Sequence, residues 1–224
     1  MNESPKFPDM CHLHWSEEAE DTRSNKVLQS TDKMPCTEVE LVVTEKLDGS
    51  NSCLTSEKVY ARSHSGEPHR DEWDWLKKKH REELMHQIPD HIAIYGEYLY
   101  ARHSIKYTEL PDYFIVFAAL DMEEEKWLSW KETVVLATEL GLPTAPVIEQ
   151  GYWEEIDKER SPSGKSEYGD TREGYVIRPY RSFDYGKWSD FAAKCVRENH
   201  IRTEELHWRK GGETETNELA GDSK

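Results

Sequence analysis

The chain has 224 residues, of which 45 are acidic and 29 basic, giving a formal net charge of −16. This length accommodates one domain with a sizeable core, or one domain with a small appendage. The negative charge excludes a generally basic nucleic-acid-binding surface, so any polyanion would have to meet a local basic cleft.

Cysteine usage and targeting patterns indicate where the protein resides. No apolar run approaches membrane-spanning length and the N-terminus has no signal-peptide pattern, so we expect a soluble, cytoplasmic protein without a membrane partner. The four cysteines are scattered along the chain, as expected for reduced thiols. Cys11, His12 and His14 lie close together, but zinc binding is disfavoured because no second ligand pair follows at finger spacing.

The chain begins with a polar, irregular stretch over residues 1–38. Phe7, Leu13 and Trp15 are its apolar anchors, so we expect a lead-in segment packed on the domain; a disordered leader is the alternative. The apolar residues 41–43 then predict a buried strand that delivers Lys46 to its end.

The residues after Lys46 suggest chemistry. A lysine is a nucleophile only when its amine is neutral part of the time, and burial, neighbouring cations or a bound metal depress its pKa. Asp48 can hold a metal or its water near a reacting phosphate, and Gly49 lets the backbone approach a ligand. The Lys-x-Asp-Gly pattern is short, however, and a strand that ends in a charged turn explains it equally well.

In the rest of the chain, the sequence pattern predicts mostly strands. Strands are expected near residues 52–55, 58–63, 91–100, 112–121, 146–148, 172–179 and 189–197. Helical spacing predicts one amphipathic helix over residues 70–88, a capping box at Ser129 and Glu132 opens a second, and a short helix is expected around 204–208. Because strands outnumber helices and do not alternate with them, we predict an α+β fold of largely antiparallel sheets with flanking helices.

Four ionisable residues fall on apolar strands: Lys46, Glu97, Glu173 and Lys194. Interior ion pairs are one explanation, with Glu97 joined to Arg62 and Lys194 to Glu173. Burying several charges for stability alone is unfavourable, because desolvation often exceeds the Coulombic gain. A cleft that takes a polyanion together with a divalent metal accounts for both signs of charge.

Six short motifs follow one another between about residues 40 and 200. They are Lys46-Leu47-Asp48-Gly49, Ala61-Arg62-Ser63, Tyr95-Gly96-Glu97, Phe114-Ile115-Val116-Phe117, Arg172-Glu173-Gly174-Tyr175-Val176 and Ala193-Lys194-Cys195-Val196-Arg197. In this order they resemble the collinear motifs of covalent nucleotidyltransferases, a superfamily of ATP-dependent RNA ligases, DNA ligases and mRNA capping enzymes. The chain looks most similar to the RNA ligases, because Asn51 stands where the other two classes usually carry an arginine.

The resemblance implies a domain organisation and an activity. It implies a nucleotidyltransferase (ATP-grasp-like) domain over residues 39–208 and a flexible acidic tail over 209–224, without an OB-fold, since only about 27 residues follow Arg197. It further implies an ATP-dependent RNA ligase that uses Mg²⁺ or Mn²⁺. Lys46 would take up AMP covalently from ATP, AMP would pass to a 5′-phosphate, and a 3′-hydroxyl would displace it.

The resemblance also assigns roles to residues. Lys46, Asp48 and Lys194 would be catalytic, and Glu173 would bind the metal. Within the nucleotide site, Glu45 would contact the adenine edge, Glu97 the ribose, and Phe117 would stack on the base unless it is an ordinary core residue. The full set expected to bind the nucleotide is Glu45, Lys46, Leu47, Asn51, Arg62, Glu97, Phe117, Val176, Lys194 and Arg197.

Partners and rival functions follow from the same resemblance. We expect RNA strand ends or a nicked duplex as substrate in RNA repair, an end-processing kinase or phosphatase as partner, and a monomeric protein. A minimal ATP-dependent DNA ligase and a non-catalytic nucleic-acid end-binding module are the alternatives. The retained charges of Lys46, Glu97, Glu173 and Lys194 argue against the second, because a decayed site would not keep costly buried charges.

Overall fold

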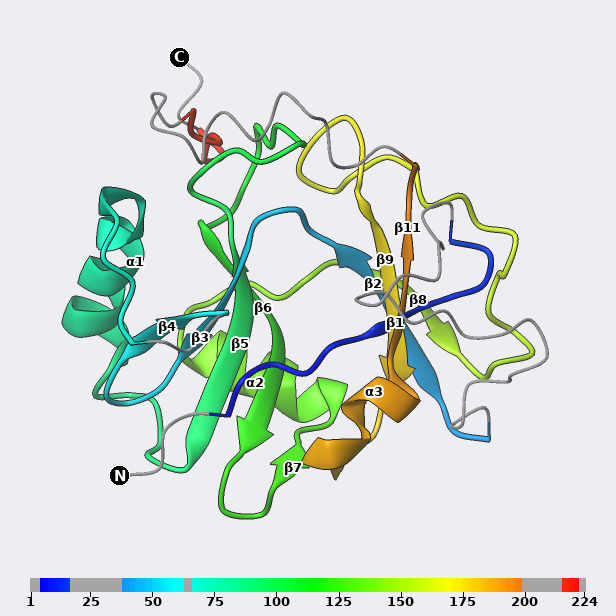
Figure 1. The fold of residues 1–224 in the computed structure, drawn as a ribbon, viewed down its shortest axis with the longest axis horizontal. Coiled ribbons are helices and arrows are strands. Elements are labelled where there is room, and N and C mark those ends of the chain that lie inside the picture. Colours follow the sequence, from blue (N-terminus) through cyan, green and yellow to red (C-terminus); the bar gives the residue numbers. More distant parts are fainter. Residues whose placement is uncertain (1–4, 17–37, 63–65, 199–214, 222–224) are drawn as a thin grey trace.

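Two β-sheets lie side by side in the computed structural model, which describes residues 5–16, 38–62, 66–198 and 215–221 (Figure 1). The first sheet contains, in spatial order, β1 (Cys11–His12), β11 (Ala193–Val196), β9 (Gly174–Pro179), β2 (Leu41–Lys46) and β8 (Val147–Gly151). The second contains β10 (Phe183–Asp184), β7 (Lys126–Trp127), β6 (Phe114–Asp121), β5 (Ile92–Tyr98), β3 (Ser50–Leu54) and β4 (Val59–Ala61). Apart from the parallel β1–β11 pair, these neighbours run antiparallel, which confirms the predicted fold class.

Strand β2 connects the two sheets. Its apolar residues Leu41, Val42 and Val43 are fully buried between β8 and β9, as the sequence predicts for an apolar run. The chain leaves the first sheet after Lys46 and enters the second at Ser50, the first residue of β3. Lys46 therefore stands at the junction of the two sheets.

The helices flank the sheets. The predicted helix over residues 70–88 is a 3₁₀ turn (Asp71–Trp73), α1 (Asp74–Lys79) and a π-helical turn (His80–Leu84). Its predicted apolar face is buried at Trp73, Leu76, His80, Leu84 and Ile88. The turn widens at His80, whose ring nitrogen hydrogen-bonds Thr55 O at 2.6 Å and so ties the helix to the end of β3.

The second helix is the one that the capping box predicts. Helix α2 (Trp130–Glu139) starts after Ser129, whose hydroxyl accepts from Glu132 N while the Glu132 carboxylate accepts from Ser129 N. The helix ends before Gly141, which has a φ of +67°. Within the described residues, no helix combines the length and apolar character needed to cross a bilayer.

The predicted strand over residues 189–197 begins as a helix. A 3₁₀ turn (Tyr185–Lys187) leads into α3 (Trp188–Phe191), and only Ala193–Val196 form β11. The helical turn packs the Trp188 ring against Phe7 and Trp127, at centroid distances of 4.8 and 4.6 Å. This aromatic packing overrides the strand pattern of the sequence.

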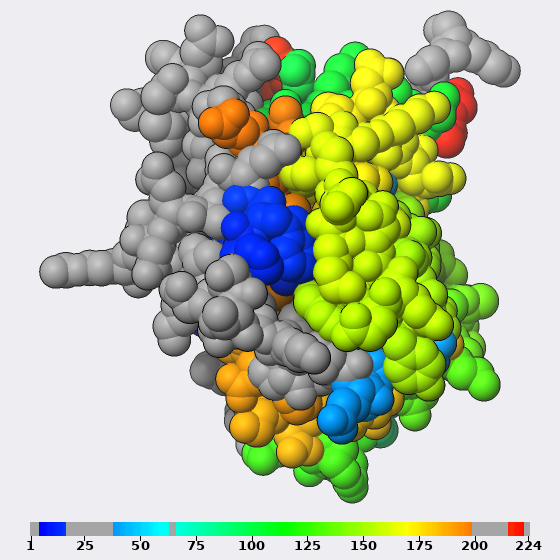
Figure 2. Space-filling view, turned by 90° about the vertical axis from the view of Figure 1, so that its right-hand side faces the viewer, coloured from blue at the N-terminus to red at the C-terminus, as the bar shows by residue number. Residues whose placement is uncertain are grey.

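The N-terminal segment, residues 5–16, runs across both sheets (Figure 1). Phe7 joins an aromatic cluster on the second sheet, and β1 pairs with β11 at the edge of the first. Farther along, the Trp15 ring lies 6.1 Å from the Trp153 ring, where the N-terminal segment packs beside the chain after β8 (Figure 2). The remainder of the predicted lead-in, 17–37, lies outside the described residues.

The C-terminal segment differs from its prediction where the structure describes it. Residues 215–221 fall within the predicted flexible tail, but they pair with the loop after β5 through Ala101, Tyr107 and Leu110. The buried amide of Asn217 anchors the segment there. The helix expected around 204–208 lies outside the described residues.

Gly174 is required by the close pairing of β9 with β11. A Cβ atom at this position would lie 2.0 Å from Cys195 O. We expect Gly174→Ala to destabilise the protein by about 3 kcal/mol in urea unfolding, because the neighbouring strand would have to move. Gly186→Ala, where a Cβ atom meets nothing within 4 Å, is the matched control and should leave the unfolding free energy nearly unchanged.

Candidate active site

A cavity of about 590 Å³ takes its walls from both sheets and from the N-terminal segment. Most residues expected to form the site line it, although they come from positions far apart in the sequence. They are Glu45, Lys46, Leu47, Asp48, Asn51, Arg62, Glu97, Phe117, Glu173, Val176 and Lys194. Arg197 is not among the lining residues; its backbone N instead donates to Glu173 O at 3.0 Å.

Lys46 and Glu173 form an ion pair in the wall of this cavity. Lys46 Nζ lies 2.5 Å from Glu173 Oε2, and the Glu173 side chain is buried. Burial by itself would lower the pKa of Lys46, but the charges of Glu173, Glu97 and Asp48 outweigh it and raise that pKa. Three carboxylates thus surround the amine, and depression of its pKa by a bound metal stays a prediction.

Glu97 extends from β5 of the second sheet and interacts electrostatically with Lys46. Its Oε1 accepts from Gly49 N at 3.1 Å, and Arg62, considered as its partner, pairs with Asp9 instead. Gly49 permits this approach, since a Cβ atom there would lie 2.5 Å from Tyr98 O. Burial raises the pKa of Glu97 to about 8, with Lys46 opposing the shift and Glu173 adding to it.

The raised pKa of Glu97 predicts how stability depends on pH. An unfolded glutamate releases its proton near pH 4.5, whereas folded Glu97 holds its proton to about pH 8. The stabilising contribution is therefore complete below the unfolded pKa and is lost as the pH rises through about 8. We expect urea unfolding to show a larger loss of stability between pH 5 and 9 in the wild type than in Glu97→Gln. Equal losses in the two proteins would contradict a raised Glu97 pKa.

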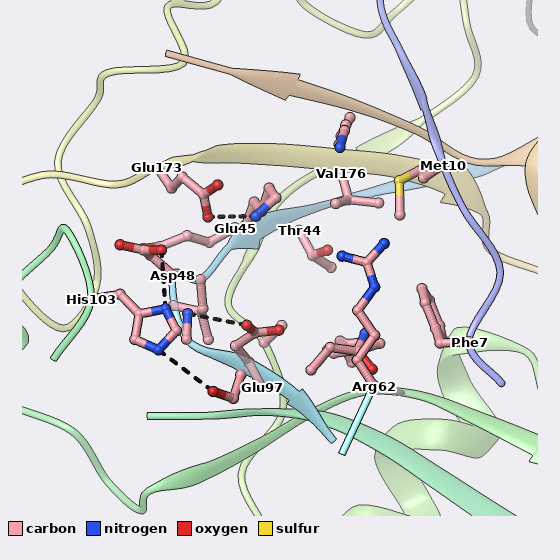
Figure 3. Close-up of a pocket in the computed structure, with 18 of the residues that line it drawn as sticks. Phe7, Met10, Thr44, Glu45, Asp48, Arg62, Glu97, His103, Glu173 and Val176 are labelled. Atoms are coloured by element: carbon pink, nitrogen blue, oxygen red, sulfur yellow. Dashed lines mark hydrogen bonds and ion pairs between the residues drawn. The ribbon is translucent and has the colours of Figure 1, made fainter. Parts of the chain in front are cut away.

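Asp48 holds a loop rather than facing the cavity with both oxygens free. Its Oδ2 accepts from Ser104 N (2.7 Å), Ser104 Oγ (2.5 Å) and Ile105 N (3.0 Å). Its Oδ1 lies 3.9 Å from His103 Nδ1 (Figure 3). Asp48 thus fixes the position of His103, a cavity-lining residue that sequence reasoning did not assign to the site.

Glu45 and Lys194 occupy different surroundings. The Glu45 carboxylate accepts from Ser166 Oγ at 2.6 Å and Glu167 N at 3.1 Å, and burial raises its pKa. Those contacts occupy both of its oxygens, and a contact with an adenine edge stays a prediction. Burial lowers the pKa of Lys194, and repulsion from Lys46 lowers it further, so the two lysines lie close enough to share a polyanion.

The apolar part of the cavity includes Phe117 and Val176. Phe7 and Met10 border it from the N-terminal segment, on the same side as Arg62 (Figure 3). Sequence reasoning missed both, because an apolar residue in an irregular segment resembles any packing anchor.

Arg178 is a further lining residue that the sequence did not indicate. Its guanidinium is buried over the rings of Trp130 and Trp188, at 4.9 and 5.6 Å, and it donates to Phe117 O. Burial lowers its pKa to about 9. Its only signal in the sequence is an arginine within the apolar run of β9.

The residues fit a nucleotide bound with a divalent cation. The cavity volume is within the range of small-molecule sites, with an apolar part and a charged part. Asn51 Oδ1 is buried without a hydrogen-bond partner among the described residues, as expected for a group that awaits a ligand. The described part contains no group of three or more His, Cys, Asp or Glu side chains that could hold a metal, and Glu173 as a metal ligand stays a prediction.

Comparisons with known proteins agree with this fold. Several solved structures of Naegleria gruberi RNA ligase share the fold. A variant with ATP and Mn has a TM-score of 0.54 and 18% identity, covering 75% of this chain and 54% of that one. A second variant with ATP and Mn has a TM-score of 0.55 and 17% identity (80% and 55% covered). The enzyme with pyrophosphate has a TM-score of 0.52 and 18% identity (82% and 58% covered).

The chain spans somewhat more than half the length of these structures. A search of curated protein sequences found no match. The model of the RNA ligase family matches residues 39–196, which include Lys46, Glu97, Glu173 and Lys194. Over this range the chain belongs to the RNA ligase family.

Proposed function

We propose that this protein is an ATP-dependent RNA ligase that joins 5′-phosphate and 3′-hydroxyl ends. One observation carries the proposal: Lys46 pairs with buried Glu173 in a nucleotide-sized cavity of a chain that belongs to the RNA ligase family. The solved Naegleria structures with ATP and Mn and with pyrophosphate support ATP and a divalent metal as cofactors.

Lys46 is the nucleophile in this proposal. Its neutral amine attacks the α-phosphorus of ATP, a P–N bond forms, the bond to the bridging oxygen breaks, and pyrophosphate leaves. Lys46 then donates AMP to the 5′-phosphate of an RNA strand, and a 3′-hydroxyl displaces AMP to seal the strand. Each step is a displacement at phosphorus, for which positioning and charge neutralisation are the main needs.

The other lining residues position the nucleotide and neutralise its charge. Lys194 faces the phosphates from β11, and Asn51 and Arg62 contact the phosphate or the RNA. Glu97 binds the ribose hydroxyls, Phe117 stacks on the base, and Val176 lines the same cavity. Leu47 lines the same cavity.

The ion pair of Lys46 must loosen before attack, because a protonated amine has no lone pair to offer. A divalent cation bound by Glu173 would supply positive charge beside Lys46, which favours the neutral amine and offsets the charge of the phosphates. Asp48, with its Oδ2 already bonded to the backbone of Ser104 and Ile105, keeps the turn after Lys46 in place.

The choice of RNA over DNA is tested with two nicked duplexes. They differ only in whether the last nucleotides on the 3′-hydroxyl side are ribose or deoxyribose. We expect faster sealing of the ribose nick, since a protein distinguishes RNA through the 2′-hydroxyl and A-form groove shape near the acceptor. Equal sealing would favour a minimal ATP-dependent DNA ligase.

We further propose that the protein works as a monomer in the cytoplasm, in RNA repair, on ends prepared by a kinase or phosphatase. The alternative is a protein that is not an enzyme, namely a non-catalytic module that binds nucleic-acid ends. The presence of Lys46, Glu97, Glu173 and Lys194 in one cavity supports the enzyme. A module of that kind would bind RNA without taking up AMP.

A further inference from the structure

We propose that Asn217, in the C-terminal segment, is a positioning residue for the active site. It acts through residues 99–107, which follow β5 and which we call the 99–107 loop. The inference rests on the proposed function, because its effect is measured on the transfer of AMP to Lys46. Neither the sequence motifs nor the family match reaches Asn217, since the match ends at residue 196.

The active site holds one side of the 99–107 loop. Asp48 Oδ2 accepts three hydrogen bonds from Ser104 and Ile105, and Asp48 N donates to Tyr107 Oη at 2.9 Å. His103 lies between Asp48 and Ser50 and lines the cavity (Figure 3). The shape of this loop therefore sets both the turn that follows Lys46 and the place of His103.

Asn217 holds the other side of the loop. Its Oδ1 accepts from Tyr107 N at 2.9 Å, its Nδ2 donates to Leu99 O at 2.7 Å, and its backbone N donates to Tyr100 O at 3.0 Å. Tyr113 Oη donates to Asn217 O at 3.2 Å. Asn217 as a whole residue is 1% exposed, and the described C-terminal segment lies beside the chain after β5 in Figure 1.

These contacts close the 99–107 loop at its base. Leu99 and Tyr107 are the ends of the loop, and one buried amide joins them with a donor and an acceptor. Tyr107 is the shared element, because its backbone binds Asn217 while its hydroxyl binds Asp48. Asn217 thus connects to the catalytic turn through a single intervening residue.

The test is single-turnover transfer of α-labelled ATP to the full-length chain, at a temperature where every variant is folded. We expect Asn217→Ala to lower the rate constant at saturating ATP about 10- to 100-fold, because misplaced catalytic groups slow the chemical step. The half-saturating ATP concentration should stay within about two-fold, since Asn217 does not line the cavity.

Two controls separate positioning from general destabilisation. Ile156→Ala truncates a buried residue and lowers stability; it belongs to a core cluster that contains no residue of the 99–107 loop, so its rate constant should stay at the wild-type value. Glu215→Gln removes an exposed ion pair with Arg102 at the start of the same segment and should also leave the rate unchanged.

Tyr107→Phe provides a second, independent variant. It removes the hydroxyl that accepts from Asp48 N but keeps the ring and the backbone contact with Asn217. We expect it to slow label transfer, and the double variant with Asn217→Ala to slow it by less than the product of the two effects. If Asn217→Ala is too unstable to assay, Tyr107→Phe alone carries the test.

Each outcome decides the inference. A wild-type rate in folded Asn217→Ala would overturn the inference. If Asn217→Ala is too unstable to assay, a wild-type rate in Tyr107→Phe would overturn it instead. A slowing in Ile156→Ala equal to that in Asn217→Ala would also overturn it, because the effect would then follow stability alone. In both cases the proposed function stands; if the wild-type chain takes up no label, the proposed function fails and the inference fails with it.

Discussion

Lys46→Ala and Lys46→Arg are both expected to lose the transfer of AMP from α-labelled ATP to the chain, by on the order of 10⁴-fold or more. Alanine removes the nucleophile. Arginine keeps the positive charge beside Glu173, but a guanidinium stays protonated at any working pH and cannot attack phosphorus. The measurement is label retained by the denatured chain in the presence of metal.

The two Lys46 variants also serve as controls for each other. Lys46→Ala leaves the buried Glu173 carboxylate without its ion-pair partner, and losing such a partner typically costs about 3–5 kcal/mol. Lys46→Arg preserves that charge and should unfold closer to the wild type. Label on Lys46→Arg would show that another residue is the nucleophile, because this variant is expected to be folded and inert.

Glu173→Gln is expected to slow label transfer by about 10²- to 10³-fold, which is the second large effect. The substitution keeps the size of the side chain and removes its charge. The two possible roles of Glu173 predict opposite changes in the rate of label transfer. If Glu173 only holds Lys46 protonated, removing the charge lowers the pKa of Lys46 and speeds transfer; if it also binds the metal, transfer slows.

The metal dependence separates these cases. We expect Glu173→Gln to need a higher concentration of Mn²⁺ for half-maximal labelling than the wild type does. Glu159→Gln is the matched control, since it removes a glutamate charge outside the lining of the cavity. Faster labelling of Glu173→Gln at every metal concentration would contradict the metal-binding role.

The sequence predicts the features that local pattern encodes. The apolar run before Lys46 became β2, the capping box at Ser129 became the start of α2, and the apolar periodicity over residues 70–88 became a buried face. Each of these signals lies within a few residues, so no partner elsewhere in the chain has to be known. The order of the six motifs then predicted that the scattered site residues lie in one cleft.

The features that were not predicted depend on partners far along the chain. Lys46 and Glu173 are 127 positions apart, and no local pattern indicates that their pairing raises the lysine pKa. Strands β1, β7 and β10 have two residues each, too few for an alternation to show. In the sequence, Asn217 is one polar residue in an acidic tail. Only the fold shows which backbone groups its side chain binds.

The most direct test of Lys46 as the AMP-accepting residue is to locate the label. The chain is incubated with α-labelled ATP and Mn²⁺, denatured and digested with trypsin, which does not cleave after a modified lysine. We expect label on one peptide that spans residues 34–58, uncut at Lys46. An unlabelled chain, or label confined to a peptide without Lys46, would contradict it.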